Sequence, residues 1–154
     1  MLGDVVEAAL VIGPVFVVTD DPAVVPALAE VVHDPGEGLG AAVTAGLAQV
    51  VGHTLVVNAD LPGATPSALG RLADAGLALV EAVDGTTNAL SLPDPSVFAP
   101  LYGPGSANRF RAHAPFATIA IPELELDVDS EADLERLTAT ALGPRTRALL
   151  AVPA

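Results

Sequence analysis

The 154-residue sequence contains no cysteine, so disulfide bonds, thiolate nucleophiles and zinc sites built from cysteine are excluded. It has no tryptophan, one tyrosine and four phenylalanines, too few for an aromatic surface that stacks single-stranded bases. Basic residues are also scarce: six face nineteen acidic residues, which gives a formal net charge of −13. This charge repels nucleic acids and anionic membranes. An anionic ligand must therefore be held by a metal ion, backbone N–H groups or a local cation.

Long apolar runs are absent as well, because Gly, Pro or Asp interrupts each one before the roughly 18 residues that a membrane span requires. No basic segment precedes an apolar one as in a secretory signal. We therefore expect a cytoplasmic protein without membrane association. Hydrophobic residues still make up 51% of the chain, which is enough for a core, and the length fits one domain over residues 1–154.

The hydrophobic pattern alternates between short β-branched runs and helical periodicity, which is typical of an α/β fold. The runs at 15–19 and 54–58 lack the alternation of a half-exposed strand, so we predict that both strands are buried. The full set of predicted strands is 15–19, 30–33, 54–58, 77–83, 88–92, 118–121 and 124–127. The predicted helical segments are 2–11, 23–28, 41–50, 65–75, 102–113 (a loop and a helix), 130–142 and 145–151.

Three aspartates are candidate metal ligands. Asp60 directly follows a predicted strand, at the carboxyl edge where open α/β sheets bind their ligands. Asp127 and Asp129 alternate on an extended segment, so their carboxylates point the same way. Together the three carboxylates suit a hard divalent cation such as Mg²⁺. The alternatives are structural: Asp60 turns the chain and caps the next helix, and Asp129 or Ser130 caps the helix that follows.

Gly36, Gly38 and Gly40 flank a turn that opens a predicted helix. Without side chains, their N–H groups can approach a nucleotide or a phosphate at the helix N-terminus. Their spacing is neither that of the dinucleotide fingerprint nor that of a Walker loop. The alternative interpretation is an ordinary flexible turn.

Two further segments carry hydrogen-bonding groups. Thr87 and Asn88 place a hydroxyl and an amide at a predicted turn between strands, and Gly103 precedes a helix that begins near Ser106. Such a helix start suits a carboxylate or a phosphate group. The alternative for Ser106 is a routine N-cap.

Taken together, five motifs resemble the phospholactate/phosphoenolpyruvate guanylyltransferases over nearly the full chain. The resemblance implies a three-layer α/β fold related to the MobA-like (molybdopterin) guanylyltransferases and the GT-A glycosyltransferases, with a mixed, mainly parallel sheet. The motifs are Asp-Pro-Gly-Glu-Gly-Leu-Gly-Ala-Ala (34–42), Val-Asn-Ala-Asp-Leu-Pro-Gly (57–63), Gly-Thr-Thr-Asn-Ala-Leu (85–90), Tyr-Gly-Pro-Gly-Ser (102–106) and Leu-Asp-Val-Asp-Ser-Glu-Ala-Asp-Leu (126–134).

The resemblance also implies an activity. The phosphate of phosphoenolpyruvate or 2-phospho-L-lactate attacks the α-phosphorus of GTP and releases pyrophosphate, a step in the biosynthesis of the deazaflavin coenzyme F420. Such a reaction needs charge neutralisation and in-line positioning more than a covalent nucleophile. The resemblance gives each group of residues a role. Mg²⁺ is held by Asp60, Asp127 and Asp129; the guanine lies near Gly36, Gly38 and Gly40; the acceptor is bound by Thr87, Asn88, Gly103 and Ser106.

The sequence departs from the family pattern at two places. Family members carry an Asn where this chain has Gly40, and they begin with a strand and a Lys-bearing loop that receives the triphosphate, whereas this sequence opens with a predicted helix and contains no Lys. We therefore expect the first strand of the fold to be missing and a sheet edge to be exposed, which favours a homodimer. Two alternative functions stay open: a related nucleotidyltransferase for a pterin or sugar phosphate, and a catalytically impaired remnant that acts as a binding module.

Overall fold

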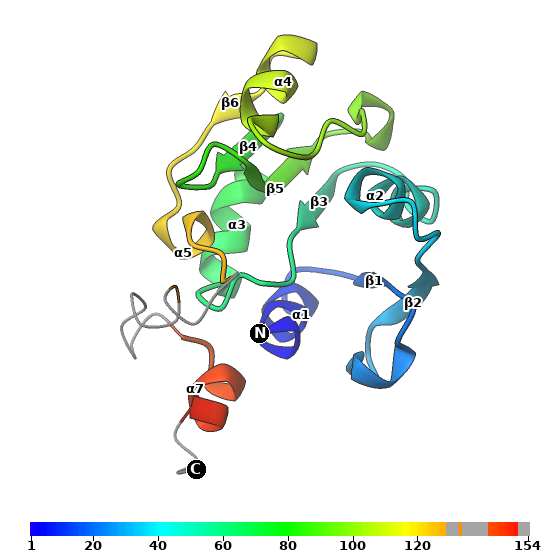
Figure 1. The fold of residues 1–154 in the computed structure, drawn as a ribbon, viewed down its shortest axis with the longest axis vertical. Coiled ribbons are helices and arrows are strands. Elements are labelled where there is room, and N and C mark those ends of the chain that lie inside the picture. The colour runs from blue at the N-terminus through cyan, green and yellow to red at the C-terminus, as the bar shows by residue number, and fades with distance from the viewer. Residues whose placement is uncertain (129–132, 134–141, 151–154) are drawn as a thin grey trace.

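The computed structural model describes residues 1–128, 133 and 142–150 and contains helices on both sides of a mixed sheet (Figure 1). The strands are β1 (Phe16–Thr19), β2 (Glu30–His33), β3 (Thr54–Val57), β4 (Ala78–Glu81), β5 (Thr87–Leu92) and β6 (Ala117–Thr118). The α-helices are α1 (Leu2–Leu10), α2 (Leu39–Leu47), α3 (Pro66–Asp74), α4 (Ser106–His113), α5 (Pro122–Glu125) and α7 (Pro144–Leu150). Two 3₁₀ turns, η1 (Pro22–Val24) and η2 (Pro95–Val97), lie between them.

The strands form two separate sheets in the part of the chain that the structure describes. β1 and β2 pair in parallel, with Phe16 opposite Glu30. The larger sheet has the order β3-β5-β4-β6. In it β5 runs antiparallel to both β3 and β4, whereas β6 runs parallel to β4. The prediction of an α/β fold with a mixed sheet is therefore confirmed.

The four-stranded sheet is covered by helices on both faces, because successive residues of a strand point to opposite sides. Val80 and Ala89 face a core cluster formed with α1, α3 and α5, whereas Leu79 and Leu90 face a second cluster that includes Phe110 of α4. All five of these side chains are almost fully buried. This arrangement is the predicted three-layer architecture of helices, sheet and helices.

Local sequence signals explain the elements next to the candidate site. The Thr65 hydroxyl accepts a hydrogen bond from the Ala68 N–H at 3.1 Å and so caps α3, and Pro66 takes the first helical position, where its missing N–H costs nothing. The Asp84 carboxylate accepts hydrogen bonds from the Thr86 N–H and hydroxyl in the turn between β4 and β5. Gly85 supplies the positive φ of 83° that this turn requires.

Several predicted elements were wrong in kind or in extent. Residues 124–127, predicted as a strand, form none: Leu124 and Glu125 end the one-turn helix α5, because Pro122 favours a helical first turn and the Leu124 N–H bonds the Ile121 carbonyl at 2.8 Å. The predicted helix at 23–28 shrinks to the 3₁₀ turn η1, since Pro26 cannot continue a helix.

The strands β1 and β3 are half-buried, not buried as predicted. Each pairs with a single neighbouring strand among the described residues, so one edge of each lacks a partner strand. The predicted helix at 130–142 lies almost entirely outside the described residues. The predicted homodimer stays a prediction.

The helix α7 packs against α1 through a buried carboxylate. Asp4 of α1 is 3% exposed and accepts hydrogen bonds from the Arg145 N–H at 2.8 Å and the Thr146 N–H at 2.9 Å. These are donors of the first turn of α7, which have no partners within their own helix. None of the helices in the described part of the chain is long and apolar enough to span a membrane.

Candidate functional site

The predicted acceptor-binding residues Thr87 and Ser106 meet where β5 and α4 begin. The Ser106 hydroxyl donates a hydrogen bond to the Thr87 hydroxyl at 3.0 Å, and both residues are at most 1% exposed. Gly105, not Ser106, is the N-cap residue of α4, so the interpretation of Ser106 as a routine N-cap is wrong. The Ser106 hydroxyl instead links α4 to β5 through its hydrogen bond to Thr87.

A β-bulge separates the side chains of Thr87 and Asn88. Val80 pairs with Ala89 and Glu81 pairs with Thr87, so Asn88 is the extra residue on β5. Its side-chain N–H donates to the Leu124 carbonyl of α5 at 3.1 Å. The side-chain oxygen of Asn88 is buried and accepts no hydrogen bond within the described residues. The bulge thus directs Thr87 toward α4 and Asn88 toward α5.

Asp60 and Asp127 lie on neighbouring segments. The Val128 N–H donates to the Asp60 carbonyl at 3.1 Å, which places the chain at 127–128 beside the loop that follows β3. Both aspartates are partly exposed. Thr65, not Asp60, caps the next helix, so the interpretation of Asp60 as that helix cap is wrong.

The third predicted ligand, Asp129, lies outside the described residues. Within them, no three His, Cys, Asp or Glu side chains stand close enough together to hold a metal ion. The structure therefore brings the segments of Asp60 and Asp127 together, while the three-carboxylate site stays a prediction.

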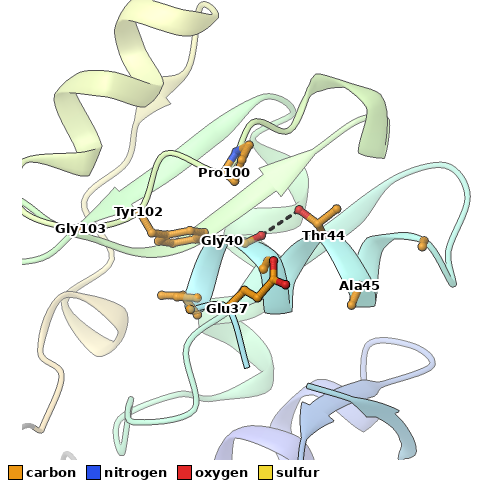
Figure 2. Close-up of a pocket in the computed structure, with 11 residues that line it drawn as sticks. Glu37, Gly40, Thr44, Ala45, Pro100, Tyr102 and Gly103 are labelled. Carbon is orange, nitrogen blue, oxygen red and sulfur yellow. Dashed lines mark hydrogen bonds between the residues drawn. The ribbon is translucent and has the colours of Figure 1, made fainter. Parts of the chain in front are cut away.

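A groove of about 1000 Å³ lies between the start of α2 and the loop before α4 (Figure 2). Gly38 and Gly40 at the start of α2 line it together with Pro100, Tyr102 and Gly103 of the loop before α4, and Gly40 packs directly on Pro100. The groove thus brings two of the predicted guanine-binding glycines to the same cavity as one predicted acceptor-binding residue. The other six predicted site residues in the described part of the chain do not line it: Gly36, Asp60, Thr87, Asn88, Ser106 and Asp127.

The three glycines of the 36–40 loop occupy different structural environments. The Gly36 N–H donates to the Asp34 carboxylate at 2.9 Å, in a turn outside the groove lining. Gly38 is the N-cap residue of α2 and has a φ of 88°. Gly40 packs on Pro100: a Cβ there would lie 2.7 Å from the Pro100 Cβ and 3.2 Å from its Cα. The Asn that family members carry at this position therefore has no room in this conformation.

Tyr102, which the sequence analysis did not assign to the site, forms a wall of the groove. Its ring stands edge-on to Phe110 with centroids 5.4 Å apart and lies 6.2 Å from Phe98. Burial raises the pKa of the Tyr102 hydroxyl far above its usual value, so the phenol stays neutral. The signal that could have found it is that it is the only tyrosine in the chain and opens the Gly-Pro-Gly-Ser segment.

Comparisons with known proteins bear on the family and the fold of the chain. The family model of the MobA-like NTP transferase domain matches residues 1–101. A phosphoenolpyruvate guanylyltransferase of Geodermatophilus obscurus is 36% identical over 97% of this chain and 76% of its own length. One from Nocardia farcinica is 38% identical over 90% of this chain and 70% of its own. A solved structure of a hypothetical transferase from Thermus thermophilus is 25% identical, with a TM-score of 0.62 over 87% of this chain and 85% of that one.

The fold and these matches define an enzyme class, that of the nucleotidyltransferases. The chain belongs to the MobA-like NTP transferase family and, within it, to the family of the phosphoenolpyruvate guanylyltransferases. The resemblance drawn from the five motifs is confirmed at the level of the family. The roles of individual site residues stay predictions.

Proposed function

We propose that this chain transfers the GMP moiety of GTP to the phosphate of phosphoenolpyruvate or 2-phospho-L-lactate, in a Mg²⁺-dependent step of coenzyme F420 biosynthesis. An acceptor phosphate oxygen forms a bond to the α-phosphorus of GTP, the bond from that phosphorus to the bridging oxygen breaks, and pyrophosphate leaves. The relatives named phosphoenolpyruvate guanylyltransferase support this choice of donor and acceptor.

The observation that carries the proposal is the buried hydrogen bond between Thr87 and Ser106. It joins the Gly-Thr-Thr-Asn-Ala-Leu segment to the Gly-Pro-Gly-Ser segment, which are the two motifs proposed to bind the acceptor. Gly103, the first residue of the second motif, lines the same groove as Gly38 and Gly40. An acceptor at Gly103 would therefore share one groove with a nucleotide at the start of α2.

Asp60, Asp127 and Asp129 would hold the Mg²⁺ ion. Carboxylate oxygens are the ligands that Mg²⁺ prefers, and the backbone bond between Val128 and Asp60 keeps two of these segments adjacent. When bound, the ion would neutralise charge on the reacting phosphates. The protein itself contributes orientation: Thr87, Asn88, Gly103 and Ser106 would hold the acceptor, and the loop with Gly36, Gly38 and Gly40 would hold the guanine.

Calorimetric titration with phosphoenolpyruvate and with GTP, each with and without Mg²⁺, tests the proposal. We expect both ligands to bind, phosphoenolpyruvate only when Mg²⁺ is present, and pyrophosphate to be released when both are supplied. Asp60→Asn should abolish the Mg²⁺-dependent binding of phosphoenolpyruvate. Asp74→Asn is the matched control, because it removes the same charge at an exposed position at the end of α3. Equal acceptor affinity in the two variants would remove Asp60 from the site.

A further inference from the structure

Arg109 holds the loop that precedes its own helix. Its guanidinium donates to the Leu101 carbonyl from Nε at 3.1 Å and from Nη2 at 2.8 Å, to the Tyr102 carbonyl at 3.1 Å and to the Pro104 carbonyl at 2.5 Å. One side chain thus bonds three backbone carbonyls on the two sides of Gly103. This loop lines the groove.

No carboxylate in the described part of the chain forms an ion pair with Arg109. Arg71, Arg111 and Arg145 each form an ion pair with a glutamate, whereas Arg109 forms none within the described residues. In a chain with a net charge of −13, the Arg109 guanidinium therefore has a field that favours an anion nearby. The Nη2 atom lies 3.5 Å from the position that a Cβ of Gly103 would occupy.

The three carbonyls that accept hydrogen bonds from Arg109 also determine where the N–H groups of the following residues point. The peptide bonds of the described chain are all trans, so each carbonyl and the N–H of the next residue point in opposite directions. The N–H groups of Tyr102, Gly103 and Gly105 are therefore turned away from the guanidinium. None of these three donates a hydrogen bond within the described part of the chain.

We propose that Arg109 is a positioning residue for the acceptor: it fixes the 101–105 loop so that its N–H groups, backed by the guanidinium, bind an acceptor anion such as a carboxylate. This inference rests on the proposed function. Arg109 acts through the backbone, since its own donors are occupied by carbonyls. It explains how a strongly acidic protein binds a small anionic substrate at this loop.

The test compares Arg109→Ala with Arg111→Ala. Both variants remove one exposed or half-exposed arginine from α4, but Arg111 bonds Glu81, Thr118 and Asn108 and not the loop. We expect the dissociation constant and the KM for phosphoenolpyruvate to rise tenfold or more in Arg109→Ala, with GTP affinity unchanged, and both to stay within twofold in Arg111→Ala. Arg109→Lys should behave like the alanine variant, because an ammonium cannot bond three carbonyls in the geometry of a planar guanidinium. Equal acceptor affinity in the two alanine variants would overturn the inference.

A second measurement separates this inference from the proposed function. Tyr102 is the only tyrosine and the chain has no tryptophan, so its fluorescence reports on the loop alone. We expect iodide to quench this fluorescence more strongly in Arg109→Ala than in wild type or Arg111→Ala. If wild type binds no phosphoenolpyruvate, the proposed function fails and so does the acceptor role of Arg109, whereas increased quenching would still establish its hold on the loop. Unchanged quenching would overturn that hold even if wild type binds the acceptor.

Discussion

A strand of the smaller sheet and a central strand of the larger sheet differ sharply in burial although they look alike in sequence. β1 (Phe-Val-Val-Thr) and β4 (Ala-Leu-Val-Glu) are both short apolar runs. Every residue of β1 is only half-buried, whereas the first three residues of β4 are completely buried. β4 is a central strand with partners on both edges, and helices cover both of its faces, while β1 pairs only with β2 among the described strands. Burial is thus decided by the neighbours of a strand.

The comparison also locates the candidate site. The larger sheet carries Thr87, Asn88 and the loops that lead to Asp60 and Ser106. The smaller sheet supports α2, which packs on it where Gly46 lies against Val18 and which presents Gly38 and Gly40 to the groove. The predicted acceptor-binding residues Thr87, Asn88 and Ser106 therefore lie in the well-packed region, and the predicted guanine-binding glycines lie beside the less buried one. We expect the guanine side to be the more easily deformed.

The largest expected effect is a difference between the same substitution in the two sheets. Val80→Ala in β4 should lower the free energy of unfolding by about 2–3 kcal/mol, because it opens a cavity at a fully buried position. Val17→Ala in β1 should cost about 1 kcal/mol or less, since that side chain is half-exposed. Urea denaturation measures both. Equal losses of unfolding free energy in the two variants would contradict the difference in burial between β4 and β1.

A smaller effect is expected where the two regions meet. Gly40→Ala places a Cβ against the backbone of Pro100 and should destabilise the protein by about 1–2 kcal/mol. Gly70→Ala in α3 is the control, because the nearest atom to its Cβ is 4.0 Å away, and it should stabilise by about 0.4–1 kcal/mol. The two urea midpoints should move in opposite directions. A stabilising Gly40→Ala would mean that α2 and Pro100 are not in contact.

The smallest effect concerns the attachment of α7 to α1. Burial raises the pKa of Asp4, but the hydrogen bonds from Thr146 and Arg145 outweigh it and hold the pKa below its ordinary value of 3.8. The carboxylate therefore stabilises the fold fully above pH 3.8, and this contribution is lost as the pH falls through the lowered pKa. Asp4→Asn should cost about 1 kcal/mol at pH 7.

The pH dependence of unfolding tests this assignment. Between pH 5 and 3, wild type should lose more stability than Asp4→Asn, since the variant has no proton to take up at this position. Glu7→Gln, on the same helix, removes the partner of the exposed Arg145 and serves as the comparison. Identical pH profiles for wild type and Asp4→Asn would show that another group controls acid unfolding.

The order of the elements was predictable where local signals were strong. Thr65 and Pro66 indicate the start of α3, and Asp84 with Gly85 indicates the turn before β5. The prediction missed α5, because its alternating Glu and Leu residues also fit a strand, and the hydrogen bond from the Leu124 N–H to the Ile121 carbonyl that makes the turn helical is seen only in the structure. It also could not reveal the bulge at Asn88, which depends on the register between β4 and β5.

The candidate site was predictable as a set of motifs but not as a geometry. Gly103, Ser106 and Thr87 could be picked out along the chain, yet nothing local says that two of their hydroxyls share a hydrogen bond. Arg109 reads as one more exposed helix residue until the structure places it against three carbonyls.

The sequence by itself determined the α/β class, the acidic character that excludes nucleic acids as ligands, and the family, because these depend on composition, periodicity and the order of motifs. The tertiary structure alone decided which strands are buried, that Gly40 must lack a side chain beside Pro100, and that Arg109 bonds three backbone carbonyls of the loop before α4. The physical reason is that burial, close approach and charge compensation are properties of neighbours in space. In this chain those neighbours are separated by 60 residues of sequence between Gly40 and Pro100 and by 141 between Asp4 and Arg145.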